Sequence, residues 1–221
     1  MPRLLCFALL LLVSRTLMSQ QTPVAVESEP HHRVVLKNDF VVVMHVNVPP
    51  GDTTLFHTHS HDRVAVELTD ATITQQKPGK AEGEPEPRKT GDVSALQTDA
   101  PYTHRVHNVG TTVFEVLDVE LLQRPREPAS TVAAKVEAEN PSARVYQWML
   151  APGTTSAMHA HDRPYLIIAA TPLMLKMTDP EGKSFTHEVK AGDIHWIDAK
   201  VTHSLTNEGK TAGEIVEIEL K

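Results

Sequence analysis

A ten-residue pattern that occurs twice constrains the fold of this chain more than any other feature. The first copy runs from Pro50 to His59 (PGDTTLFHTH), and the second runs from Pro152 to His161 (PGTTSAMHAH). Each copy consists of a Pro-Gly turn, five further residues and His-x-His. Because alternate residues of a β-strand point to the same face, both histidines of a copy can face one point. Two converging neutral imidazoles suit a first-row transition metal when a third ligand comes from elsewhere in the chain.

A second repeated pattern supplies that third histidine in each half. A Gly-Asp pair opens the pattern, which ends His-x-x-x-Asn, from His104 to Asn108 in the first half and from His203 to Asn207 in the second. The segments that begin at the two asparagines also match, as NVGTTVFEVLDVEL and NEGKTAGEIVEIEL. Two patterns that recur in the same order, about a hundred residues apart, indicate a duplicated domain.

Together the two patterns resemble the two motifs of the cupin superfamily, here in its two-domain (bicupin) form. The resemblance covers nearly the whole chain after its first residues. It implies an all-β protein of two tandem cupin β-barrels of jelly-roll type, with any metal inside each barrel mouth. With composition, it divides the chain into a signal peptide (1–19), an N-terminal tail (20–33), a first barrel (34–123), a linker (124–141) and a second barrel (142–221).

Charge and the first residues indicate the compartment and the partners. The formal net charge is −7 and no basic stripe is present, which argues against nucleic acid or an anionic membrane as a partner. Arg3 precedes an apolar run, residues 4–13, that is too short to span a bilayer and is typical of a signal peptide. We therefore expect a secreted or periplasmic protein without stable membrane insertion after processing. An uncleaved membrane anchor is the alternative.

The one cysteine, Cys6, lies in this segment, which excludes thiolate ligands and disulfides from the mature chain.

The metal hypothesis uses one triplet of histidines in each half. The triplets are His57, His59 and His104, and His159, His161 and His203. Metal-binding cupins usually add a carboxylate after the histidine pair, but no Asp or Glu occupies that position in either half. Three neutral ligands leave the full charge of a divalent ion, which favours an anionic substrate, an oxygen species or hydroxide as a further ligand. Cupin dioxygenases acting on thiols or diketones have a similar ligand set. Histidine accepts Fe, Mn, Ni, Cu and Zn alike, so the metal stays open.

Three interpretations remain at this stage. The first is a metal-binding bicupin with possible dioxygenase-like activity on a small, anionic substrate. The second is a metal-free module that binds an organic acid or sugar, and the third is a scaffold whose histidines only fill the barrels. Arg63 and Tyr165 are candidate substrate-binding residues. An inward Arg63 would clamp a carboxylate and an outward one would be a surface charge. Tyr165 would donate a hydrogen bond to a metal-bound ligand, or pack. The sequence indicates neither enzymatic activity nor an oligomeric state.

Several local expectations complete the sequence-based picture. The second barrel should be the better metal site, because the spacing from Gly192 to His203 matches the cupin motif and Tyr165 replaces the cationic Arg63. A short helix is expected at 130–139, within the linker. Side chains expected to face solvent are His31, His32, Glu115, Asp118 and Glu120.

Overall fold

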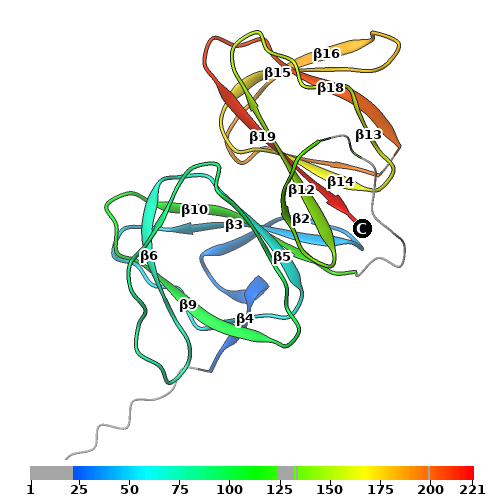
Figure 1. Cartoon of the computed structure of the whole chain (residues 1–221). Helices are drawn as coiled ribbons and strands as arrows, with labels where there is room; N and C mark the ends of the chain where they lie inside the picture. The colour runs from blue at the N-terminus through cyan, green and yellow to red at the C-terminus, as the bar shows by residue number, and fades with distance from the viewer. Residues whose placement is uncertain (1–21, 124–131, 133, 199) are drawn as a thin grey trace, which may run out of the picture.

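The structure is a computed structural model that describes residues 22–123, 132, 134–198 and 200–221. Two β-barrels lie side by side in this part of the chain (Figure 1). The single helix among the described residues is the 3-10 turn η1 (Val26–Ser28), and none is long and apolar enough to cross a membrane. The expected all-β architecture of two tandem barrels is therefore confirmed.

The first barrel has two five-stranded sheets. Their strand orders are β1-β4-β9-β6-β7 and β2-β3-β10-β5-β8. The strands are β1 (Val24–Ala25), β2 (His32–Lys37), β3 (Val41–Val48), β4 (His57–His59), β5 (Asp62–Glu67), β6 (Ala71–Gln76), β7 (Glu86–Arg88), β8 (Val93–Leu96), β9 (Tyr102–Asn108) and β10 (Phe114–Leu121).

The second barrel repeats this topology, and its described residues include no counterpart of β1. Its sheets have the orders β11-β12-β19-β14-β17 and β13-β18-β15-β16. The register repeats as well, since His57 pairs with His104 and His159 pairs with His203. The strands are β11 (Val136–Glu139), β12 (Ala143–Leu150), β13 (His159–His161), β14 (Tyr165–Ala169), β15 (Leu173–Thr178), β16 (Ser184–Val189), β17 (Ile194–Ile197), β18 (Val201–Asn207) and β19 (Gly213–Leu220).

One hydrophobic core lies between the barrels, where a sheet of each faces the other. Eight buried residues come from each side: Val41, Val43, Val64, Val66, Leu68, Leu117, Val119 and Leu121, and Ala143, Val145, Leu166, Ile168, Ala170, Val216, Ile218 and Leu220. The outer face of each of these sheets is thus as apolar as a barrel interior. Burial on both faces accounts for the continuous apolar runs of β3 and β14, where a half-exposed strand would alternate.

Strand β10 shows what this core does to the polar residues. Leu117 and Val119 point to the second barrel, so the alternating side chains of Asp118 and Glu120 point into the first barrel, where they are 3 % and 2 % exposed. The prediction that Asp118 and Glu120 face solvent is wrong, because the second barrel covers the face that would otherwise be wet. The Glu115 side chain keeps 30 % of its surface exposed.

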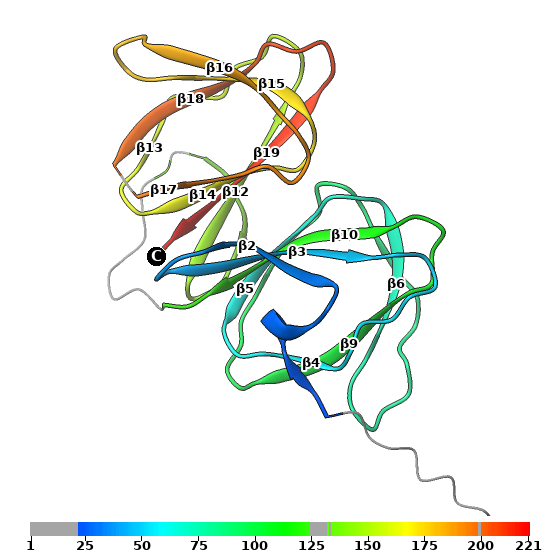
Figure 2. The ribbon, with the colours of Figure 1, turned by 180° about the vertical axis from the view of Figure 1, so that it is seen from behind.

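The N-terminal segment is part of the first barrel. Strand β1 pairs in parallel with β4, with Val24 opposite His57 (Figure 2). Glu29 is buried and accepts hydrogen bonds from Leu55 N (3.0 Å) and from His32 Nδ1 (2.5 Å). The prediction of a tail at 20–33 is therefore wrong from Val24 onward. The prediction of a solvated His32 is also wrong. No local pattern marks these residues, because their partners lie in β4 and the turn before it.

The predicted linker also contains regular structure. Residues 136–139 form β11, which pairs antiparallel with β12, in place of the expected short helix. Residues 132, 134 and 135 are not helical either, and residues 130, 131 and 133 of that expected helix lie outside the described residues, as does the predicted signal peptide at 1–19.

Candidate metal centres

The first histidine triplet meets inside the first barrel. Strand β4 supplies His57 and His59, and the neighbouring strand β9 supplies His104 directly opposite His57. All three side chains are buried, with ring centroids 4.6–5.1 Å apart. The His-x-His spacing places the first two rings on the same face of β4, as the sequence predicted. The antiparallel pairing then brings the third ring to the same place.

Each ring of this triplet is held by its Nδ1 atom. A backbone carbonyl, a carboxylate and an amide oxygen are the three partners, and these accept hydrogen bonds, so each Nδ1 carries the hydrogen. Burial raises the pKa of Glu120 to about 7, and above that pH its carboxylate is charged. The bonds run from His57 to Leu55 O (2.9 Å), from His59 to Glu120 Oε1 (2.7 Å) and from His104 to Gln75 Oε1 (2.9 Å).

The three Nε2 atoms therefore present lone pairs to one another. Burial lowers the pKa of His57 to about 3 and that of His59 to about 4, and it also lowers the pKa of His104, so the rings are neutral near pH 7. His59 Nε2 and His104 Nε2 are 3.1 Å apart. Two lone pairs at this distance repel unless a cation lies between them. Ligand atoms at right angles on a metal, each about 2.1 Å from it, would be about 3.0 Å apart. The first triplet thus fits a divalent metal.

A cavity of about 500 Å³, with both polar and apolar residues in its wall, adjoins this triplet. Arg63 points into it, with 14 % of its side chain exposed, and donates a hydrogen bond to Asp118 Oδ2 at 3.0 Å. Burial alone would raise the pKa of Asp118, but the Arg63 charge holds it below its usual value. Of the two orientations left open by the sequence, Arg63 thus has the inward one. Its charge is partly compensated by Asp118.

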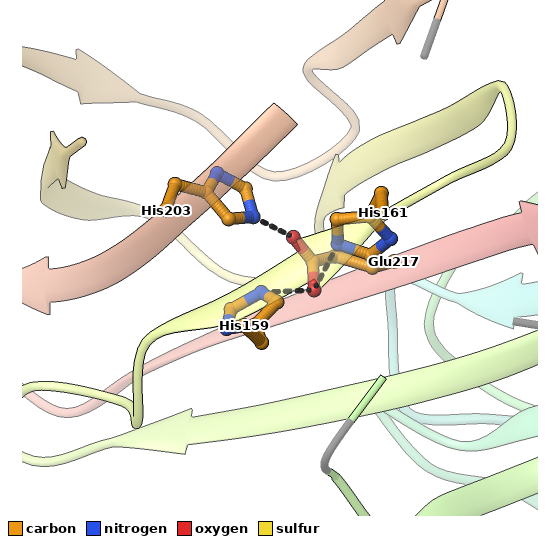
Figure 3. A group of neighbouring side chains, drawn as sticks. All are labelled: His159, His161, His203 and Glu217. Carbon is orange, nitrogen blue, oxygen red and sulfur yellow. Dashed lines mark hydrogen bonds and ion pairs between the residues drawn. The ribbon is translucent and has the colours of Figure 1, made fainter. Parts of the chain in front are cut away.

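The second triplet meets inside the second barrel, together with a carboxylate. His159 and His161 come from β13, His203 from β18 and Glu217 from β19 (Figure 3). All four side chains are buried. The Glu217 carboxylate lies between the rings, with one oxygen, Oε2, 3.1 Å from His159 Nε2 and 3.4 Å from His161 Nε2, and the other, Oε1, 3.0 Å from His203 Nε2.

This arrangement needs a positive charge. His159 Nδ1 lies 2.8 Å from Ala157 O, so it carries the hydrogen, and the Nε2 of the neutral ring would face the Glu217 carboxylate with a lone pair. Burial would raise the pKa of Glu217, but the three histidines hold it well below its usual value. Burial likewise opposes charge on His161, yet Glu217 and Glu219 raise its pKa to about 9. Either an imidazolium proton or a metal ion can supply the charge, and the donor set of three nitrogens and a carboxylate fits a divalent metal.

Comparison with known proteins was made at the level of sequence and of structure. No family model and no curated protein matches the chain. A cupin 2 conserved barrel domain protein from Leptotrichia buccalis superposes with a TM-score of 0.53 and 12% identity over 86% of this chain and 88% of that one. A Bacillus subtilis oxalate decarboxylase studied for its Mn(II) centres gives 0.52 and 12% over 82% and 69%. The chain has a two-domain cupin fold.

A dioxygenase is among the other structures that this chain resembles. A salicylate 1,2-dioxygenase from Pseudaminobacter salicylatoxidans superposes with a TM-score of 0.53 and 13% identity over 82% of this chain and 71% of that one. The structural neighbours thus include a decarboxylase and a dioxygenase, and the buried histidine groups of this chain suit a divalent metal of undetermined identity. At these identities the likeness concerns the fold alone.

The carboxylate of the second centre was missed because it lies outside the motif where cupins usually have it. Glu217 belongs to the last strand of the barrel, 14 residues after His203. The first barrel has Asp118 at the same register position, opposite Ala65 where Glu217 is opposite Ile167. Aligning EVLDVEL with EIVEIEL would have paired the two acids. The aspartate is one methylene shorter and is bound by Arg63, so it does not enter the first triplet as Glu217 enters the second.

Tyr165 explains why the Glu217 carboxylate can lie among the three histidines of the second barrel. It takes the position of Arg63, since Arg63 pairs with Glu120 and Tyr165 pairs with Glu219. The Tyr165 ring is buried and stacks on His161, with centroids 3.8 Å apart and planes at 13°. The ring thus packs, while the buried hydroxyl has no hydrogen-bond partner among the described residues, so its hydrogen bond to a ligand stays a prediction. No arginine from this position competes for Glu217.

Proposed function

We propose that this bicupin binds a divalent transition metal in both barrels. The ligands would be His57, His59 and His104 in the first barrel, and His159, His161, His203 and Glu217 in the second. The observation that carries the proposal is the set of three Nδ1 bonds in the first barrel, which turns three lone pairs to one point. Glu120 and Gln75 orient His59 and His104 from behind, as partners of metal-bound histidines commonly do. Iron, manganese, nickel, copper and zinc all satisfy these donors.

We further propose an enzyme of dioxygenase-like type, with a small anionic substrate in the first barrel. A bound divalent metal would supply Lewis-acid or oxygen chemistry. The chain's own contribution is a cavity in which Arg63 and Arg88 attract a carboxylate and the apolar walls exclude water. The names of the two enzymes among the structural neighbours, for oxalate and for salicylate, favour substrates of this class. Export from the cytoplasm remains part of the proposal, supported by the apolar run at residues 4–13.

A metal-free binding module is the second candidate. A protonated His161 can balance the Glu217 charge, because its pKa is raised to about 9 by Glu217 and Glu219 against the effect of burial. The second cluster can therefore hold together as a buried ion pair. In that case the arginines of the first cavity would bind an organic acid without a metal.

Metal analysis of purified variants separates the two candidates. We expect metal in the wild-type chain after removal of any affinity tag. The double variant His159→Ala/His161→Ala should lose most of it, since its centre has four donors, and His57→Ala/His59→Ala should lose less. The exposed pair in His187→Ala/His195→Ala serves as the control and should keep the wild-type content. Equal metal in all four proteins would reject the metal proposal, and stabilisation by small acids in chelator would then support the binding module.

Metal-dependent oxygen uptake tests the enzyme proposal separately. Oxygen consumption is recorded with a panel of small carboxylates, before and after chelation. Turnover that chelator abolishes and Arg63→Met reduces supports the assignment. If the metal-loaded chain turns over no member of the panel, the enzyme proposal is rejected and only the proposal of metal binding stands.

A further inference from the structure

The two barrels contain equivalent cavities. The cavity of the second barrel has a volume of about 320 Å³. Eight of its lining positions have register counterparts in the lining of the first cavity. For example, Leu175 pairs with Asn207 as Ile73 pairs with Asn108, and both Leu175 and Ile73 line their cavities. The difference between the two cavities is therefore one of side chains.

That difference is a change from polar to apolar. Three positions carry it, and each is assigned by strand pairing. Glu67, opposite Val116, becomes Ala169, opposite Ile215. Arg88, opposite Ala71, becomes Val189, opposite Leu173. Two residues beyond the Ile73 and Leu175 positions, Gln75 becomes Met177.

Apolar side chains thus form most of the wall of the second cavity. The wall consists of Ile167, Ala169, Leu175, Met177, Val189, Ile194, Ile197 and Ile215, and its polar residues are Asp193, His187 and His195, all exposed. Phe185 completes the lining and is 58% exposed, with its ring stacked on that of His187 at 5.8 Å. An apolar interior with an exposed aromatic beside it differs from a packed core, which would leave no such volume.

The cavity and the histidine cluster share the interior of the second barrel. Ile215 lies two residues before Glu217 on β19, and therefore on the same face of that strand. Ile167 lies two residues after Tyr165, whose ring stacks on His161. None of His159, His161, His203 and Glu217 lines the cavity, so the buried part of its wall carries no charged residue.

We propose that the second barrel binds an uncharged apolar molecule of the size of a single aromatic ring in this cavity. Apolar cavities of this kind bind aromatic hydrocarbons, because the ligand restores contacts that the empty wall lacks. A charged ligand would lose its hydration without gaining a partner. The first cavity, with Glu67, Gln75 and Arg88, has the opposite selectivity. The proposal requires no metal in either barrel, so it stands or falls separately from the proposed function.

Calorimetric titration of the full chain with toluene, in chelator and again with added Mn²⁺, tests this inference. We expect saturable binding at one site under both conditions. Ala169→Phe fills the cavity and should weaken binding by about tenfold or more. Met177→Gln, which restores the first-barrel residue at nearly constant volume, should weaken it in the same direction. Glu188→Gln, at an exposed residue of β16 that does not line the cavity, is the control and should leave toluene binding unchanged.

Benzoate serves as the charged counterpart of toluene. It should not compete with toluene for the second barrel. Three results would each overturn the proposal: no saturable binding of toluene up to its solubility, undiminished binding in both Ala169→Phe and Met177→Gln, or benzoate that displaces toluene with similar affinity. Thermal melts of the variants establish that each is folded, and if Ala169→Phe does not fold, the comparison of Met177→Gln with Glu188→Gln decides the question.

Discussion

Replacing Glu217 by glutamine should remove a pH dependence of stability from the metal-free protein. The pKa of His161 is raised from 6.5 to about 9 in the folded chain, because Glu217 and Glu219 outweigh the effect of burial. A raised pKa stabilises the fold fully below 6.5, and this stabilisation is lost as the pH rises through about 9. The shift corresponds to an upper limit of about 3 kcal/mol. The lowered pKa of Glu217 arises from the same interaction with His161, so the stabilisations derived from the two pKa shifts are not added.

Urea unfolding in chelator, at intervals between pH 6 and pH 9.5, measures this effect. The free energy of unfolding of the wild type should fall by up to about 3 kcal/mol across that range through this pair alone. In Glu217→Gln the fall should be mostly absent. The variant should also be less stable than the wild type at pH 6, by about 3 kcal/mol, because a buried charge pair has lost one member. Glu188→Gln changes an exposed glutamate of β16 and should behave like the wild type. The same dependence on pH in Glu217→Gln as in the wild type would refute the reasoning.

Two further predictions concern the first barrel. Gln75→Leu should weaken metal binding there by about 10- to 100-fold, because His104 loses the acceptor that orients it. Met177→Leu, at the equivalent position of the second barrel, should change metal affinity little. Competition with a chromophoric chelator measures both affinities. Arg63→Met should lower the free energy of unfolding by about 3 kcal/mol, because Asp118 stays buried without its partner, and Arg63→Met/Asp118→Leu should recover much of that loss in urea unfolding. A double variant no more stable than Arg63→Met would contradict the assigned pair.

The sequence was sufficient for the barrels and for the six histidines, because both depend on spacing. His-x-His places two rings on one face of any strand, and the repeat assigns the third. The carboxylates depend on which face of β10 and β19 is covered, and that is decided by the contact between the barrels. Leu117 faces the other barrel, so Asp118 turns inward. No local pattern carries this information, and the prediction placed Glu115 on the same side as Asp118 and Glu120, although strict alternation separates it from them.

The N-terminal residues and the histidine partners were missed for a similar reason. Glu29 and His32 acquire their roles from Leu55 and from the ring of His57, 4.6 Å from that of His32. Within β6, nothing in the sequence distinguishes Gln75 from other strand glutamines. Its contact with His104 follows from the pairing of β6 with β9. Partners of this kind follow from strand pairing, which spacing within one segment does not reveal.

The core that the two barrels share also bears on how such a chain could have arisen. Eight apolar residues on the outer sheet of each half would be exposed if that half stood alone. A single barrel with this face would be expected to pair with a second copy through the same patch. Joining two such copies in one polypeptide would keep the shared core and would allow the two halves to differ, as Arg63 and Tyr165 do at one register position.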